Sequence, residues 1–289
     1  MFALRTIAAL AVALALFAVA AAARAGDILP SSATTFAAAL PGHPALTWGA
    51  ALKTFLPDVG VATDGAIAAT KAAPVRHFSP SDDDSLPDAL HVNWLAARDV
   101  VEGGRPRLLI LADMDASGSG AIGFALLALI DPAPQPRLLD LVDVADDREN
   151  YLDDGAPLKI GRDSDLILVT SAHLDAGADY AIRKALFVDR DRIGLVASVQ
   201  LTSLNVCGYQ RTQGVDFAVL PRPGAEFATL QATVVERGKR VAEDCDPPPT
   251  DKPGLKTWRA EFRWNPVKRA FVASNKALDA LAKHNDEGL

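Results

Sequence analysis

The sequence predicts a mainly β protein: an antiparallel meander or sandwich, or partial propeller-like sheets, with a short α-containing N-terminal segment and a C-terminal helix. From about residue 90 onward, short apolar runs alternate with Asp, Gly and Pro turn signals, a spacing typical of all-β folds. Residues 258–264 alternate apolar with charged side chains, and the last part of the chain has helical spacing. The 289 residues, 49% hydrophobic and 22% charged, exclude wholesale disorder and can bury a core.

Residues 1–25 have the pattern of a secretory signal peptide. Arg5 provides the positive start, residues 7–22 form an apolar run, and residues 23–25 read Ala-Arg-Ala, an A-x-A cleavage site. The run is rich in alanine and shorter than the roughly 20 residues that a membrane span needs, so we expect cleavage rather than anchoring. The sequence therefore predicts a periplasmic or secreted protein.

The charge balance limits the partners. Of 29 basic side chains the predicted signal peptide holds two, and of 36 acidic ones it holds none, so cleavage changes the formal charge from -7 to -9. An acidic chain argues against nucleic acid or an anionic membrane surface, because phosphates repel it. No stretch after residue 25 is apolar enough to be an integral membrane segment. We expect an unidentified extracytoplasmic ligand or protein as the partner.

Residues 26–89 are expected to form an N-terminal segment that is part helical and otherwise irregular. Residues 46–56 fit a short helix with Thr47 as its N-cap and Pro57 after its end. Its apolar face would consist of Trp48, Leu52, Phe55 and Leu56. Residues 79–85, with three consecutive aspartates among turn formers, predict a solvated loop before the β-rich domain of residues 90–289.

Eight segments of the β-rich domain are predicted as strands. They are residues 107–112, 122–130, 137–144, 165–171, 180–188, 193–201, 217–220 and 229–235. Residues 108–131 and 166–189 form a faint internal repeat of strand, Asp-containing turn and strand. Only two copies are legible, so a propeller remains the alternative to an open sandwich or meander.

The C-terminal region predicts a hairpin and a helix. Residues 258–264 place their aromatic side chains on one face, interpreted as the core side of a sheet rather than a carbohydrate-stacking platform. Residues 265–268 fit a type I turn before a return strand at 269–273. Ser274 is then expected to cap a helix that runs to His284.

Cys207 and Cys245 are the only cysteines. An even count in an exported protein favours a disulfide, and no histidine lies between or near the two that could complete a metal site. Closing a loop of about 38 residues would stabilise the fold by about 4 kcal/mol on the chain-entropy estimate.

Two motifs overlap near Asp113. Residues 118–123 match G-x-G-x-x-G, but Asp113 and Asp115 just before the glycines would repel a pyrophosphate, which favours a hairpin turn over a dinucleotide site. The spacing of Asp113, Asp115 and Gly118 also matches the opening of a calcium loop. Phe124 stands at the twelfth position, where an EF-hand has glutamate, which excludes that motif. We therefore expect no cofactor, and a shorter calcium-binding turn is the alternative.

His173, beside Asp175 at a predicted strand end, is the histidine that best fits a functional role. The five histidines form no H-E-x-x-H or i, i+4 pair, and no G-x-S-x-G, S-x-x-K or P-loop occurs. Asp113, Asp115, His173 and Asp175 therefore form a candidate ligand or calcium site. The sequence identifies no catalytic residue and no metal ligand beyond these candidates.

Three functions follow from these patterns. The first is a non-enzymatic, exported binding protein, favoured by the signal peptide, the cysteine pair and the missing catalytic motifs. The second is a secreted hydrolase, directed at glycans, whose strand-end carboxylates would lie about 5–10 Å apart in a cleft. The third is a calcium-stabilised scaffold module.

Overall fold

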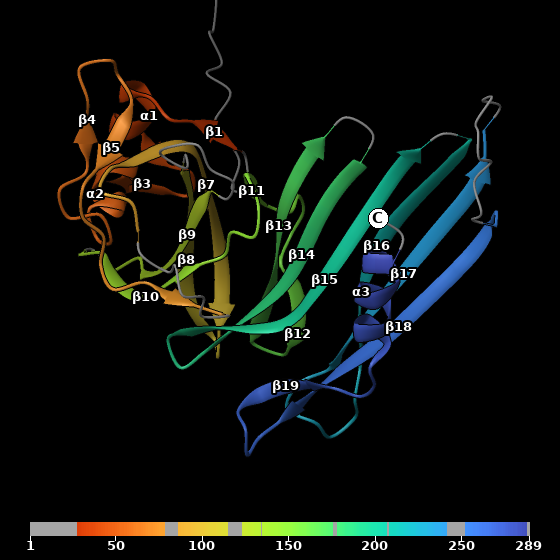
Figure 1. Ribbon diagram of the computed structural model, residues 1–289. Coiled ribbons are helices and arrows are strands. Elements are labelled where there is room, and N and C mark those ends of the chain that lie inside the picture. The colour runs from red at the N-terminus through yellow and green to blue at the C-terminus, as the bar shows by residue number, and fades with distance from the viewer. Residues whose placement is uncertain are drawn as a thin grey trace, which may run out of the picture.

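The computed structural model describes residues 28–78, 86–114, 123–133, 135–175, 178–206, 208–241 and 252–287. Two large sheets, antiparallel at nearly every pairing, make up most of it (Figure 1), which confirms the predicted mainly β fold. All eight strands predicted between residues 107 and 235 are present. Two differences are large: the sequence pattern predicts no strand at Leu90–Glu102, where the structure has one of 13 residues, and it marks only the last four residues of the strand Tyr209–Leu220. The predicted signal peptide and the predicted loop at 79–85 lie outside the described residues.

The first sheet has eight described strands. Their order is β4 (Gly60–Val61), β5 (Ile67–Ala69), β7 (Leu90–Glu102), β8 (Arg105–Met114), β9 (Phe124–Asp131), β10 (Arg137–Asp143) and β6 (Arg76–His77), with β1 (Leu29–Pro30) paired to β7. All neighbours are antiparallel except β10 and β6, which are parallel. The N-terminal segment thus contributes four of the strands of this sheet.

The second sheet has nine described strands and is a meander from β13 onward. Its order is β11 (Glu149–Leu152), β13 (Ser164–Asp175), β14 (Ala178–Asp189), β15 (Arg192–Val206), β16 (Tyr209–Leu220), β17 (Thr229–Arg240), β18 (Gly254–Asn265) and β19 (Ala270–Ala273), with β12 (Leu158–Gly161) paired to β13. The two copies of the faint repeat are the β8–β9 hairpin of the first sheet and the β13–β14 hairpin of the second.

Apolar side chains cluster in three layers. One cluster lies between the first sheet and the N-terminal segment, and another lines the far face of the second sheet. The third joins the sheets face to face, with members such as Leu109 and Leu127 from the first and Ile167 and Leu186 from the second. The sheets are therefore layers of a sandwich rather than propeller blades. Strands β8 and β9 are covered on both faces, which explains why they read as unbroken apolar runs.

The N-terminal helices are short. Helix α1 (Ala33–Ala37) precedes a small ribbon of β2 (Ala39–Leu40) and β3 (His43–Thr47), and α2 (Trp48–Leu52) follows it. Thr47 is the N-cap of α2, as predicted, and its side chain accepts a hydrogen bond from the Ala50 N–H. The helix begins at Trp48 rather than at residue 46, because the residues before it belong to β3, and it ends at Leu52.

The C-terminal hairpin and helix are present, with one correction. The predicted apolar face of β18 packs in the core through Ala260 and Phe262, which confirms its interpretation as the inner side of a sheet. Helix α3 (Ala277–Glu287) begins three residues after Ser274, which is therefore not its N-cap. The Ser274 N–H instead bonds to Glu261 as part of the sheet, and Asn275 Oδ1 accepts from the first helical N–H, that of Ala277.

Helix α3 packs on β15 and β18 of the second sheet (Figure 1) through both apolar and polar contacts. Asn285 is fully buried; its Oδ1 accepts from Gln213 Nε2 at 2.6 Å, and its Nδ2 donates to the Gln200 carbonyl at 3.1 Å. His284 Nε2 lies 2.8 Å from Glu236 Oε2. A buried polar group without partners is costly, so these bonds specify how the helix docks.

Acidification is expected to loosen α3. Burial opposes ionisation of Glu236, but hydrogen bonds from Gln213 and His284, and the charges of His284 and Lys256, outweigh it and hold the Glu236 pKa below its ordinary value. The carboxylate therefore adds stability above the unfolded-state pKa of about 4.3. That stability is lost as the pH falls through the lower folded-state pKa.

Amide hydrogen exchange of residues 277–287 checks this expectation between about pH 6 and about pH 3, after correction for intrinsic rates. A Glu236→Gln variant should already exchange faster at the higher pH and change less on acidification. Glu261→Gln, which removes a partly exposed carboxylate of β18, is the matched control. Equal pH dependence in wild type and Glu236→Gln would contradict the expectation.

Among the described residues, no helix combines the length and the apolar character that crossing a membrane requires.

Candidate functional site

Two of the four predicted site residues belong to one polar network. Asp113 lies on β8, is 2% exposed, and accepts a hydrogen bond from Asn150 Nδ2 at 2.9 Å. The same Nδ2 donates to the Asp147 carbonyl, and Asp147 Oδ1 lies 3.2 Å from His173 Nδ1. The structure thus brings Asp113 and His173 together through Asn150 and Asp147, two residues that the sequence did not indicate.

The other two predicted residues cannot be added to this network. Asp115 lies outside the described residues, as does the G-x-G-x-x-G motif except for its last glycine, Gly123. Asp175 pairs through its backbone with Ala178 at the end of the β13–β14 hairpin, and its side chain is not described. Within the described ranges, no three His, Cys, Asp or Glu side chains form a group that could hold a metal ion.

The network around Asp113 is a structural one. Ser171, 1% exposed, donates to Asn150 Oδ1 at 2.6 Å and accepts from the Asp146 N–H at 3.2 Å. Lys184 donates to the Val144 carbonyl and pairs with Asp146 at 2.6 Å. These hydrogen bonds give partners to backbone N–H and C=O groups between β10 and β11, where the chain forms no strand pairing. Because Asp113 and Ser171 are buried, neither can meet a substrate in this conformation.

A cavity of about 500 Å³ opens on the second sheet, at the turn between β14 and β15. Four aromatic rings meet edge to face at its base: Phe187, Phe227, Trp264 and Phe271, with Phe187 5.7 Å from Trp264 and 5.4 Å from Phe271 between centroids. All but Phe227 line the cavity. Its rim carries four arginines, Arg76, Arg190, Arg192 and Arg269.

Three residues of this rim region have an unusual backbone conformation. Arg190 and Asp191 form the two-residue loop between β14 and β15, with φ of 51° and 60°, and Arg269 in the β18–β19 turn has φ of 48°. Hairpin loops with positive φ at both positions favour Asn-Gly, and a bulkier residue there costs about 1–2 kcal/mol. They are the only non-glycine residues with positive φ in the described parts of the chain. Such strain gathers where the surrounding structure holds a functional geometry.

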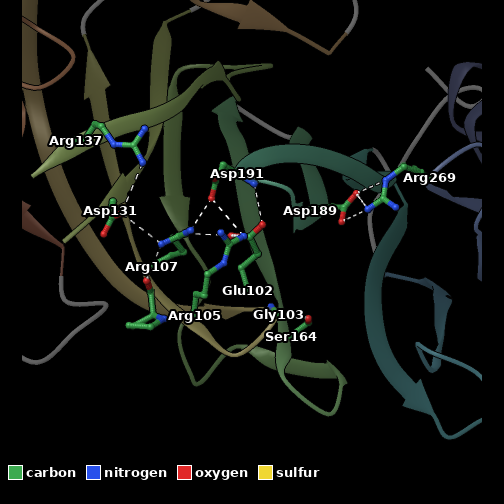
Figure 2. A network of polar contacts seen from close by, with 11 residues as sticks. Glu102, Gly103, Arg105, Arg107, Asp131, Arg137, Ser164, Asp189, Asp191 and Arg269 are labelled. Atoms are coloured by element: carbon green, nitrogen blue, oxygen red, sulfur yellow. Dashed lines mark hydrogen bonds and ion pairs between the residues drawn. The ribbon is translucent and has the colours of Figure 1, made fainter. Parts of the chain in front are cut away.

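Ion pairs with the first sheet hold the β14–β15 turn in this conformation (Figure 2). Buried Arg107 on β8 contacts Asp191 Oδ1 at 2.6 Å and Glu102 Oε2 at 3.1 Å, and the other Glu102 oxygen accepts the Asp191 N–H at 2.8 Å. Arg105 lies 3.0 Å from Glu102. Burial opposes the charge on Arg107, but hydrogen bonds with Asp191 and Glu102 outweigh it and raise the Arg107 pKa.

A second clamp joins the same turn to the β18–β19 hairpin. Arg269 holds both oxygens of Asp189 with hydrogen bonds of 2.5 and 2.9 Å (Figure 2). Its guanidinium lies 5.7 Å from the Trp264 ring centre. The hydrogen bond with Asp189 raises the Arg269 pKa. The clamp thus ties two turns 80 residues apart in sequence.

A second cavity of about 470 Å³ lies on the other side of this clamp. The two cavities share Phe187, Asp189, Arg190 and Arg269. Its lining holds equal numbers of arginines and acidic side chains, namely Arg105, Arg162, Arg190, Arg269, Glu102, Asp163, Asp189 and Glu226. The first cavity is different, because Asp189 is the only acidic side chain in its described lining.

No sequence motif pointed to the first cavity, the one with the aromatic base. Asp189 and Asp191 stand at or beside the ends of strands, where aspartate is common in β proteins whatever their function. A signal was present, since four charged residues, Asp-Arg-Asp-Arg at 189–192, stand where a two-residue turn ordinarily has Asn or Gly.

Comparison with protein-family models, with curated proteins and with solved structures finds no match for this chain. The fold and the site define a two-sheet β protein with an arginine-rimmed aromatic cavity. Its function has to be argued from that geometry.

Proposed function

We propose that this protein is an exported, non-enzymatic binding protein that holds a small molecule with an apolar part in the cavity beside the β14–β15 turn. The observation that carries the proposal is the cavity itself: about 500 Å³, with an aromatic base and converging polar groups at the rim. Ligand sites in proteins are ordinarily about 300–1,000 Å³ with this kind of lining. Export rests on the signal pattern of residues 1–25.

The geometry supports binding better than hydrolysis. A glycosidase needs two carboxyl groups that face a substrate from opposite sides. Here Asp189 is held by Arg269, Asp191 is held by Arg107, and Asp113 is buried in the structural network. The calcium alternative likewise gains no support from the described residues.

Filling the cavity tests the proposal. Gly194 lines it and pairs with Phe187 across β14 and β15, so a side chain at 194 would share the face of Phe187. A Cβ there would meet only the Phe187 carbonyl oxygen, at 3.7 Å, an ordinary contact. Gly194→Leu should therefore fold while occupying the space of the ligand.

We expect wild-type protein to bind the neutral fluorescent probe N-phenyl-1-naphthylamine, and Gly194→Leu to bind it at least about tenfold more weakly. Gly214→Leu is the matched control, an exposed strand glycine of β16 with open space around it and outside the cavity. Melting temperatures of both variants verify folding. Failure of the wild type to bind the probe, or equal binding by Gly194→Leu, would overturn the proposal.

A further inference from the structure

We propose that the ligand of this cavity is an anion, with Arg190 and Arg192 binding its charged group while the aromatic base holds its apolar body. The inference rests on the proposed function and adds the chemical class of the ligand: an amphiphilic anion with a carboxylate, sulfonate or phosphate head.

Two of the four rim arginines already have partners. Arg76 binds Asp140, with one contact of 2.5 Å, and donates to the Ile193 carbonyl at 2.7 Å. Arg269 binds both oxygens of Asp189. These two guanidiniums are neutralised by carboxylates, so they shape the rim without attracting a further anion strongly.

Arg190 and Arg192 are different. Both are exposed, and no hydrogen bond or ion pair joins either guanidinium to another residue of the described chain. Their positions flank Asp191, whose carboxylate accepts from Arg107 and whose backbone N–H donates to Glu102 on the opposite sheet. The rim therefore carries two unneutralised positive charges, although the chain as a whole has a formal charge of -7.

A local reversal of charge sign attracts anions and repels cations. Guanidinium groups also present several donors in a plane, which suits carboxylate, sulfonate and phosphate oxygens. An anion between the two arginines would relieve their mutual repulsion. The strained loop contributes as well, because its positive φ values set the direction in which Arg190 leaves the turn.

The aromatic base of the cavity indicates that the body of the ligand is apolar. Trp264 is only partly buried and Phe271 lies 5.4 Å from it edge to face, so both offer apolar surface below the arginines. A polyanion such as nucleic acid does not fit, because the net negative charge of the chain would repel its many phosphates. A single anionic head on an apolar body fits both parts of the cavity.

Two probes with the same body test the charge requirement. Anilinonaphthalene sulfonate carries one sulfonate on the ring system of the neutral probe N-phenyl-1-naphthylamine. We expect wild-type protein to bind the anionic probe at least about tenfold more tightly. Raising NaCl from about 0.05 to about 0.5 M should weaken binding of the anionic probe and leave the affinity for the neutral probe unchanged.

The double variant Arg190→Gln/Arg192→Gln should lose this preference, binding the anionic probe about tenfold or more weakly and the neutral probe within about twofold of wild type. Arg240→Gln, which removes one exposed arginine at the far end of β17, is the matched control and should change neither affinity. Displacement of the anionic probe by dodecanoate or by 1-naphthyl phosphate then separates an acyl carboxylate from an aryl phosphate.

Equal binding of the two probes, an unchanged double variant, or displacement by neither competitor would overturn the anion proposal. If the neutral probe still binds and Gly194→Leu abolishes its binding, the proposed function stands without the anion proposal. If neither probe binds wild-type protein, both proposals fail.

Discussion

Replacing Glu102 by alanine is expected to destabilise the folded protein by about 3 kcal/mol, because it removes one of the two carboxylates that pair with buried Arg107 and leaves the Asp191 N–H without its acceptor. Glu102 and Arg107 are 4% and 5% exposed. The carboxylate also accepts the N–H of Asp191 in the strained turn, so its loss releases both the first sheet and the turn of the second.

Equilibrium denaturation measures this effect. Glu261→Ala serves as the control, because its carboxylate pairs with exposed Arg263 at the surface. A pair of that kind contributes about 1 kcal/mol or less. Similar losses in the two variants would show that Glu102 does not join the first sheet to the β14–β15 turn of the second.

Replacing Cys207 by serine is expected to cost about 4 kcal/mol, the stability that a disulfide to Cys245 would provide. Both cysteines lie outside the described residues. Their neighbours are nevertheless close, since the Val241 N–H donates to the Gly208 carbonyl at 3.1 Å, one residue pair beyond the register match of Tyr209 with Arg240. Cys207 directly precedes Gly208 and Cys245 follows Val241 by four residues, so both cysteines are near this backbone pair in sequence.

The cysteine prediction is checked by peptide mapping without reductant and by thermal denaturation. Loss of the crosslink should lower the melting temperature by about 8–16 °C. Cys207→Ser, Cys245→Ser and the double variant should all lose the same amount, because one bond is removed in each. Additive losses in the double variant, or free thiols in protein prepared without reductant, would contradict the disulfide.

The strands were predictable because their signal is local. Alternation in β18 and unbroken apolar runs in β8 and β9 report which faces are buried, whatever the partner strands are. Local signals also misled at Ser274, a good capping residue that the hairpin retains in the sheet. The small strands β1 and β4–β6 were missed because two or three residues carry no periodicity. The long strand β7 was missed as well, because four consecutive buried residues, Leu95–Arg98, interrupt its alternation.

The candidate site was only partly predictable. Asp113 and His173 do share a network, but it is buried and structural, and its connecting residues Asn150 and Asp147 have no distinguishing pattern. Charged side chains ordinarily lie at the surface, so no pattern in the sequence places Glu102 and Arg107 in the interior.

By itself, the sequence determined the β class, most strand positions, the inward faces and the acidic charge, since each depends on composition or on spacing along the chain. Only the tertiary structure decided the binding cavity. Its parts come from turns some 80 residues apart, and whether an arginine there is neutralised or left to meet a ligand depends on which carboxylates the folded sheets bring beside it.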